Sequence, residues 1–222
     1  FTVIFTVGSV SSHVIVGLMF AIALNAKIHP VIRNAFRLIF IMPWIFTAAV
    51  VAIAWQLMLL PQGIINATMS NIIGGRVLIN WLGAPVIAMA TLVIVNLWRG
   101  YPFCMTSFLA GLQSIPKILY EAAIIDGANK RQLLFRITLP QLKPIILSIV
   151  LLDMIRTINL FPLIWLLTGG GPRSATETIA TFTYRYAFSD FEFGLASAAA
   201  TVSLIVTMSL TVLYVKRQRR VE

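Results

Sequence analysis

Long apolar runs separated by shorter polar connections dominate the chain. Runs long enough to cross a bilayer cover roughly residues 1–26, 38–60, 83–112, 143–167 and 193–215. About 20 apolar residues in a helix cross the hydrocarbon core of a membrane. The runs do not alternate apolar with polar residues, as the strands of a membrane β-barrel would. The pattern therefore predicts an all-α polytopic membrane helical bundle with five transmembrane helices.

Composition supports a membrane protein. Of the 222 residues 59% are hydrophobic and 11% are charged, whereas soluble domains carry about 25% charged residues. The first residue, Phe1, already lies in an apolar run without a charged leader or cleavage site, so we expect that the natural N-terminal part is missing. The single cysteine, Cys104, falls within a predicted span and is expected to be a small buried residue.

The positions of the basic residues predict the orientation and argue against nucleic-acid binding, despite a net charge of +10. Twelve of the 17 basic residues form clusters at alternate span ends: Lys27, Arg33 and Arg37; Lys117, Lys130, Arg131, Arg136 and Lys143; Lys216, Arg217, Arg219 and Arg220. Cytoplasmic loops collect Lys and Arg. We therefore place 27–37, 113–142 and the C-terminus (216–222) in the cytoplasm, and 61–82 and 168–192 outside. The basic tail either contacts anionic lipid or only anchors the last span.

The loop between the third and fourth spans contains two predicted short helices. Pro116 suits the first turn of a helix, which we expect from about 116 to 126, and Gly127 can end it. Asn129 can cap the second helix, and Pro140 is expected to end that one.

The first of these helices is apolar nearly all the way round. Ile118, Ala122 and Ile125 share one stripe, while Tyr120 and Ile124 lie opposite. A helix with this pattern must be buried, yet it is too short to span the membrane. One side can pack under the membrane helices, and the other side then needs a second protein.

The same loop carries a sequence signature. Glu121-Ala122-Ala123, Gly127, Ile137 and Leu139-Pro140 stand at the spacing of the EAA loop in permease subunits of binding-protein-dependent ABC importers. The segments 110–116 and 167–172 also resemble the subfamily that includes maltose and glycerol-phosphate permeases. The resemblance covers essentially the whole chain.

The resemblance implies a fold, a docking element and partners. The fold is that of a MetI-like permease, with residues 1–222 as one transmembrane domain that usually has at least one span before it. Residues 113–142 form a cytoplasmic coupling loop that docks on the ATPase, although a hairpin that only caps the bundle is an alternative. The implied ATPase-coupling residues are Glu121, Ala122, Ala123, Asp126, Gly127, Ile137, Leu139 and Pro140.

Motifs for chemistry are missing from the sequence. There is no Gly-x-x-x-x-Gly-Lys-Ser/Thr loop to hold phosphates. His13 and His29 lack partners at metal-ligand spacing, and no nucleophile–base arrangement is evident. We expect no enzyme activity, metal or bound cofactor in this chain, so ATP must be used by a separate partner subunit.

Ionisable residues inside spans suggest function by default. Asp153 and Arg156 stand three residues apart and are predicted to share a helix face and to pair. They form either a structural ion pair or part of a polar translocation path. Pro102, after Arg99, predicts a break in the third span because it removes a backbone hydrogen bond.

Candidates for the substrate path combine aromatic and hydrogen-bonding side chains, as sugar sites do. They are Asn96, Trp98, Asn159, Phe161, Asp153 and Arg156. Asn159 and Phe161 are chosen because they match a pattern in sugar permeases. Helix packing through polar side chains is the alternative role.

The resemblance further implies a bacterial inner-membrane protein that works with a second permease, as a heterodimer, and an ATPase dimer. A solute-binding protein would dock at a predicted external helix within 174–190. A sugar is the implied substrate, while a polyol, an oligosaccharide or glycerol phosphate also fits, and Arg99 and Arg156 leave phosphate open. An ion-coupled secondary transporter using Asp153 is the rival function, and it leaves the EAA loop unexplained.

Overall fold

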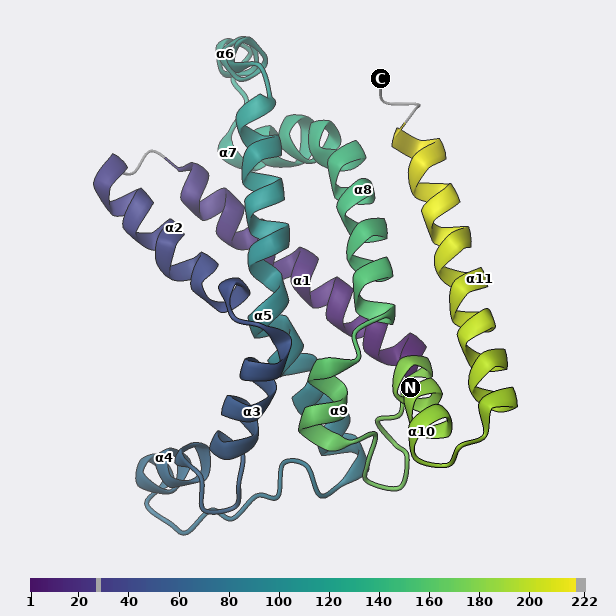
Figure 1. Cartoon of the computed structure of the whole chain (residues 1–222). Helices are drawn as coiled ribbons and strands as arrows, with labels where there is room; N and C mark the ends of the chain where they lie inside the picture. Colours follow the sequence, from purple (N-terminus) through teal and green to yellow (C-terminus); the bar gives the residue numbers. More distant parts are fainter. Residues whose placement is uncertain (27–28, 219–222) are drawn as a thin grey trace.

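The computed structural model describes residues 1–26 and 29–218, and in these ranges it is helical without a β-strand (Figure 1). The elements are α1 (Thr2–Asn25), α2 (Pro30–Ile45), α3 (Ala48–Met58), α4 (Ile64–Ile73), α5 (Pro85–Ser114), α6 (Lys117–Ile125), α7 (Lys130–Gln132), the π-helical turn η1 (Leu133–Thr138), α8 (Leu139–Ile158), α9 (Pro162–Thr168), α10 (Ile179–Phe188) and α11 (Phe193–Gln218). The predicted all-α membrane bundle is confirmed. Lys27, Arg219 and Arg220 of the predicted basic clusters lie outside the described residues, and the structure does not describe the Arg217 side chain.

Four long apolar helices in the described residues could each span a membrane: α1, α5, the continuous helix Lys130–Ile158, and α11. The predicted span 38–60 is not one straight helix. It is split into α2 and α3, which meet at 92°. Phe46 and Thr47 are extended at the bend, and the Thr47 side chain accepts a hydrogen bond from the Val50 N–H at the start of α3. The chain has five spans only if this bent pair counts as one.

The predicted fourth span, 143–167, has different ends in the structure. The helix begins at Lys130, because α7, η1 and α8 are continuous, and it stops at Ile158 before the separate helix α9. Pro140 therefore does not end a short helix, contrary to the prediction. The Leu139 N–H donates to the carbonyl of Leu134, five residues back. This wider turn lessens the clash that a proline ring makes inside a regular helix.

The third predicted span is an unbroken helix, so the predicted break near Arg99 is wrong. α5 continues through Pro102, which is buried against its neighbours. One missing backbone hydrogen bond does not interrupt a helix of 30 residues that is packed along its length.

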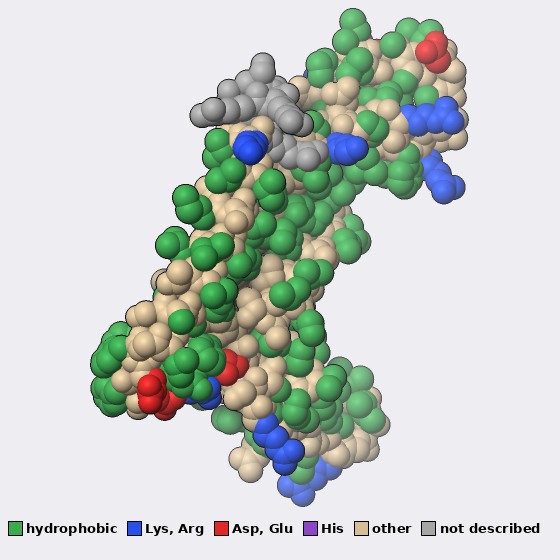
Figure 2. Space-filling model, turned by 90° about the vertical axis from the view of Figure 1, so that its right-hand side faces the viewer, with side chains coloured by type: hydrophobic (Ala, Val, Ile, Leu, Met, Phe, Trp, Pro, Cys, Tyr) green, Lys and Arg blue, Asp and Glu red, His purple; other side chains and the backbone are tan. Residues whose placement is uncertain are grey.

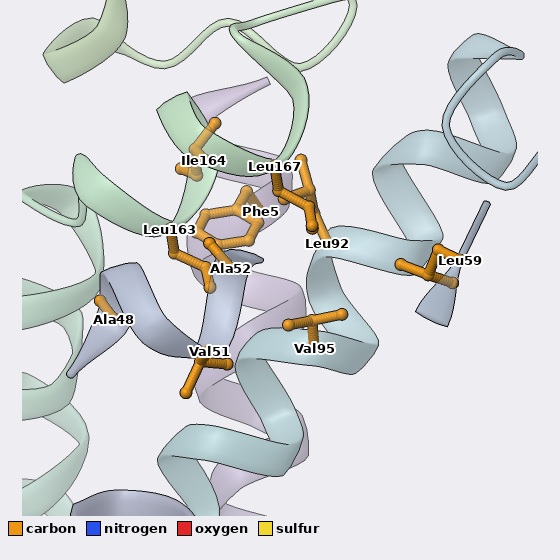
Figure 3. Packing of buried hydrophobic residues seen from close by; sticks show 10 residues of the cluster. All are labelled: Phe5, Ala48, Val51, Ala52, Leu59, Leu92, Val95, Leu163, Ile164 and Leu167. Carbon is orange, nitrogen blue, oxygen red and sulfur yellow. The ribbon is translucent and has the colours of Figure 1, made fainter. Parts of the chain in front are cut away.

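Two apolar clusters hold the bundle together around α5. The first joins α1, α3, α5 and α9, and Figure 3 shows Phe5 of α1 enclosed by Leu92 of α5 and Leu163 of α9. The second joins α1, α5 and α8, and it includes the fully buried Cys104, as expected. In contrast, the most apolar stretch of α11 has no buried residue. Figure 1 places α11 at the side of the bundle, beside α8 and α10.

Small residues let α1 and α5 approach each other closely. A Cβ atom added at Gly17 of α1 would lie 2.7 Å from the Cβ atom of Cys104 and 2.9 Å from the backbone nitrogen of Met105. A Cβ atom added at Gly100 of α5 would overlap the ring of His13. Small residues at crossing points are the usual way to pack helices inside a membrane.

A buried polar link joins α1, α5 and α8. His13 Nδ1 lies 2.7 Å from Asp153 Oδ2, and His13 Nε2 lies 3.0 Å from the carbonyl oxygen of Asn96. His13 and Asp153 are only 2% and 4% exposed. The predicted pairing of Asp153 with Arg156 is wrong, because the Asp153 carboxylate is directed across the bundle to His13.

The connections at the end of the bundle opposite α6 contain more structure than expected (Figure 1). Between α3 and α5 the chain folds around the buried Asn66 of α4. The Asn66 side chain donates to the carbonyl of Ile79 (2.8 Å) and accepts from the indole N–H of Trp81 (2.9 Å). The helix expected within 174–190 is confirmed as α10, whose first turn is capped by Thr178.

Replacing Gly100 by alanine should destabilise the bundle by about 1–3 kcal/mol, because the new Cβ would collide with the buried His13 ring. Denaturant unfolding in detergent measures this loss. Gly8→Ala is the matched control, since its Cβ would make only ordinary contact with Val93, at 3.7 Å. Equal stability of the two variants would show that the close approach is not needed.

A double-mutant cycle should separate the two possible partners of Asp153. We expect His13→Ala and Asp153→Ala to be coupled by about 1–3 kcal/mol in the free energy of unfolding, because either change strips the other group of its hydrogen bond. Arg156→Ala and Asp153→Ala should be nearly additive. A larger coupling with Arg156 than with His13 would contradict the observed geometry.

Candidate functional site

The helix α6 projects from one end of the bundle (Figure 1), and none of its residues is buried. Ile118, Ile124 and Ile125 expose 69%, 58% and 86% of their surface. Burying apolar area yields about 25 cal/mol per Å², so covering these side chains would release several kcal/mol. No described part of the chain covers them.

Local signals in the sequence set the ends of α6. Pro116 is the N-cap residue, so α6 begins at the next residue, one position later than expected. Gly127 ends the helix, as predicted, and has a left-handed φ of +79° that favours glycine. Asn129 then caps α7 through a reciprocal pair of hydrogen bonds with Gln132, at 2.8 and 2.9 Å, which confirms its predicted role.

One polar contact ties α6 to the long helix below it. The Thr138 hydroxyl donates to the carbonyl of Leu133 (3.1 Å), so the Tyr120 hydroxyl, 3.1 Å away, must donate to Thr138. Tyr120 is half-buried on the side of α6 that faces η1. The opposite, apolar side is left open.

The eight candidate coupling residues fall into two groups. Those on or just after α6 are exposed, except the half-buried Ala123: Glu121, Ala122, Ala123, Asp126 and Gly127. Those on η1 and α8 belong to the long helix: Ile137, Leu139 and Pro140. Ile137 and Leu139 are half-buried, and Pro140 is exposed.

A second candidate site is a cavity of about 220 Å³ in the middle of the bundle. Its lining comes from α1, α2, α5, α8 and the connection after α8: His13, Trp44, Asn96, Arg99, Gly100, Phe103, Asp153, Arg156, Thr157 and Leu160. The structure thus brings together three of the predicted path residues, Asn96, Asp153 and Arg156.

The other predicted path residues lie elsewhere. Trp98 makes an edge contact with Trp55, with ring centres 5.8 Å apart. The Asn159 side chain donates to the carbonyl of Ile155, at 2.8 Å. Phe161 packs against an aromatic group that includes Tyr184, at 4.7 Å. None of these three lines the cavity.

Sequence reasoning missed several residues of the cavity, above all His13 and Trp44. His13 is 140 residues from its partner Asp153, and no spacing rule links positions so far apart. Phe103 could have been predicted from the sequence, because it follows Arg99 by one helical turn and therefore lies on the same face of the helix. Its ring lies under the Arg156 guanidinium, whose central carbon is 4.4 Å from the ring centre.

The charged side chains of the cavity differ in whether they have a hydrogen-bond or ion-pair partner. Asp153 is bound by His13. The buried Nε atom of Arg99 has no hydrogen-bond partner among the described residues. Arg156 rests on Phe103 in a cation–π contact and forms no ion pair with a described carboxylate. The cavity therefore presents two guanidinium groups and one carboxylate that already has a partner.

Comparison with known proteins gives the family. The sequence profile of the family described as "Binding-protein-dependent transport system inner membrane component" matches residues 13–222. The chain is 38% identical over 216 residues to the trehalose/maltose transport system permease protein MalF of Thermococcus litoralis, which covers 97% of this chain and 72% of that protein. It is 31% identical over 223 residues to the multiple sugar-binding transport system permease protein MsmF of Streptococcus mutans, covering 100% of this chain and 75% of the relative.

A solved structure has the same fold. A chain of a bacterial ABC transporter involved in the import of the acidic polysaccharide alginate superposes with a TM-score of 0.86 at 25% sequence identity, over 99% of this chain and 77% of that chain. The match includes the protruding helix α6 and the cavity helices, because it extends over nearly the whole length. Profile, relatives and structure agree that this chain belongs to the family of binding-protein-dependent transport system inner membrane components, the permeases of ABC importers, which are not themselves enzymes.

Proposed function

We propose that this permease imports a sugar or a related solute that a solute-binding protein delivers, and that a separate ATPase drives it through α6. The relatives named for trehalose/maltose and multiple-sugar transport, and the alginate importer, support the substrate class. The observation that carries the coupling proposal is the uncovered apolar surface of α6, a helix without a buried residue.

The proposed orientation places α6 in the cytoplasm. Basic residues gather around it, at Lys117, Lys130, Arg131 and Arg136. Figure 2 shows Lys and Arg side chains at the ends of the molecule, with hydrophobic side chains along the body between them. Cytoplasmic loops are the ones enriched in Lys and Arg. On this proposal 1–222 is one transmembrane domain and 113–142 is its coupling loop.

A mechanical path leads from α6 to the cavity. The Tyr120–Thr138 contact joins α6 to the helix Lys130–Ile158, which has 29 residues. At about 1.5 Å per residue this rod is about 40 Å long, and it carries Asp153 and Arg156 in the cavity wall. A movement of α6 with the ATPase would tilt the rod and change access to the cavity. ATP state and access are then coupled because both depend on the same contact.

The proposed partners follow from surfaces that the chain leaves open. The open side of α6 fits a cleft in an ATPase subunit, which would bind the ATP. The Arg156 side chain is exposed at the cavity although it belongs to a membrane-spanning helix, so a second permease is needed to complete the path. The external side, with α10 and the turn before it, would receive the solute-binding protein.

The ion-coupled alternative gains no support from the geometry. It required Asp153 to be free to exchange a proton or cation with the path. Instead, Asp153 Oδ2 is held at 2.7 Å by His13 in a buried position. The family assignment also accounts for the loop that the alternative left unexplained.

Changes on the open side of α6 should uncouple transport without preventing insertion. We expect Ile125→Ser and Glu121→Lys each to lower solute uptake about tenfold or more, because a central contact in a docking interface is typically worth 2 kcal/mol or more. Uptake into proteoliposomes and retention of the ATPase on the purified permease measure the effect. Ile72→Ser is the matched control, since Ile72 is 79% exposed on α4, at the opposite end of the bundle from α6 (Figure 1). Normal uptake by both α6 variants would refute the docking role.

The energy source is tested on the reconstituted importer. With ATP inside the vesicles, uptake should continue when ionophores collapse the ion gradients. It should stop when ATP is withdrawn, because on this proposal a partner ATPase supplies the energy for transport. Uptake that follows the ion gradient and ignores ATP would favour the secondary-transport function.

A further inference from the structure

The charges of the membrane cavity do not cancel. The carbonyl of Asn96 can only accept a hydrogen bond, so His13 Nε2, 3.0 Å away, must carry a hydrogen. The 2.7 Å contact between His13 Nδ1 and Asp153 Oδ2 then needs a second proton between the two atoms. Wherever this proton resides, the His13–Asp153 pair as a whole is neutral. The charge of the cavity is therefore set by Arg99 and Arg156.

These two arginines both line the cavity, and their positive charges repel each other. The Nε atom of Arg99 is buried and has no hydrogen-bond partner in the described residues. The Arg156 guanidinium carbon lies 4.4 Å from the ring centre of Phe103, and no described residue accepts a hydrogen bond from its N–H groups. Guanidinium groups are costly inside a membrane unless an anion or polar partner accepts their hydrogen bonds.

We propose that the cavity binds an anionic group of the transported solute, a carboxylate or a phosphate, between Arg99 and Arg156. This inference rests on the proposed import function and specifies its substrate class as an acidic sugar or sugar phosphate. The planar fork of arginine matches both anions with two parallel hydrogen bonds. No free carboxylate of the cavity competes, because His13 already occupies Asp153.

The size and the aromatic wall of the cavity fit the anionic end of a sugar. Its volume of about 220 Å³ is below the usual 300–1,000 Å³ of pockets that enclose a whole small molecule. Trp44 and Phe103 lie side by side in the wall, with ring centres 6.1 Å apart. A sugar ring resting against the face of Trp44 would place its acidic substituent next to the guanidinium of Arg156, which lies over Phe103.

The test measures binding to the membrane complex of permeases and ATPases in lipid nanodiscs by tryptophan fluorescence. Glucuronate and glucose 6-phosphate are the anionic probes, and glucose is the neutral probe with the same ring. A Trp44→Phe variant identifies the part of the signal that arises at the cavity. Arg99→Gln and Arg156→Gln remove one charge each, and Arg156→Lys keeps the charge without the fork. Arg76→Gln, at an exposed external position, is the matched control.

We expect a saturable, Trp44-dependent signal with at least one anionic probe and none with glucose at the same concentrations. The tighter of the two anions identifies the preferred group. Each glutamine variant at the cavity should weaken binding about tenfold or more, Arg156→Lys should weaken it less, and Arg76→Gln should leave it unchanged. Equal binding of glucose, an equal response to chloride, no response to either anion, or wild-type binding by both cavity variants would overturn the proposal.

The readout involves neither ATP hydrolysis nor uptake, so the two proposals can fail separately. If the α6 variants transport normally while anion binding depends on Arg156, the coupling proposal fails and the anion site stands. If the α6 variants lose transport while glucose binds as well as the anions do, import stands and the acidic substrate class is wrong.

Discussion

A histidine held between a carboxyl group and a backbone carbonyl organises the centre of this permease. His13 reaches a carboxylate on α8 and a backbone carbonyl on α5, and it fits only because Gly100 has no side chain. Inside a bilayer, where water cannot substitute, the His13 ring and the Asp153 carboxyl group would otherwise lack these partners. The crossing of α1 with α5, the position of α8 and the polarity of the cavity all follow from this arrangement. An apolar cluster on either side of it completes the bundle.

The two proposed functional sites, the cavity and α6, differ in polarity and in exposure. The cavity lies between apolar helices and is lined by polar side chains, whereas α6 is apolar and stands uncovered outside the bundle. Both are therefore incomplete in the isolated chain: one lacks a counter-charge, and the other lacks a protein surface. The continuous helix Lys130–Ile158 connects them. On the proposed function, this continuous helix would carry a movement of α6 to the cavity.

Features encoded by neighbouring residues were predictable from the sequence, and features that depend on distant residues were not. Gly127 and Asn129 act within one turn of the helix that they end or begin, so both ends of α6 and the start of α7 were found to within a residue. The partner of Asp153 was missed because spacing along one helix favours Arg156, while the actual partner comes from α1. Pro102 and Pro140 were both expected to interrupt helices. Packing along α5 and a widened turn before α8 absorb them instead.

The π-helical turn η1 has a geometric consequence for the whole importer. A turn of this kind accommodates one residue more than the α-helix around it. Each residue of an α-helix advances the side chains by about 100°. If Leu133–Thr138 became a regular α-helix, α6 and α7 would rotate by roughly that angle about the helix axis, relative to the cavity. The extra residue thus fixes the angle, about the helix axis, between the proposed docking helix α6 and the cavity.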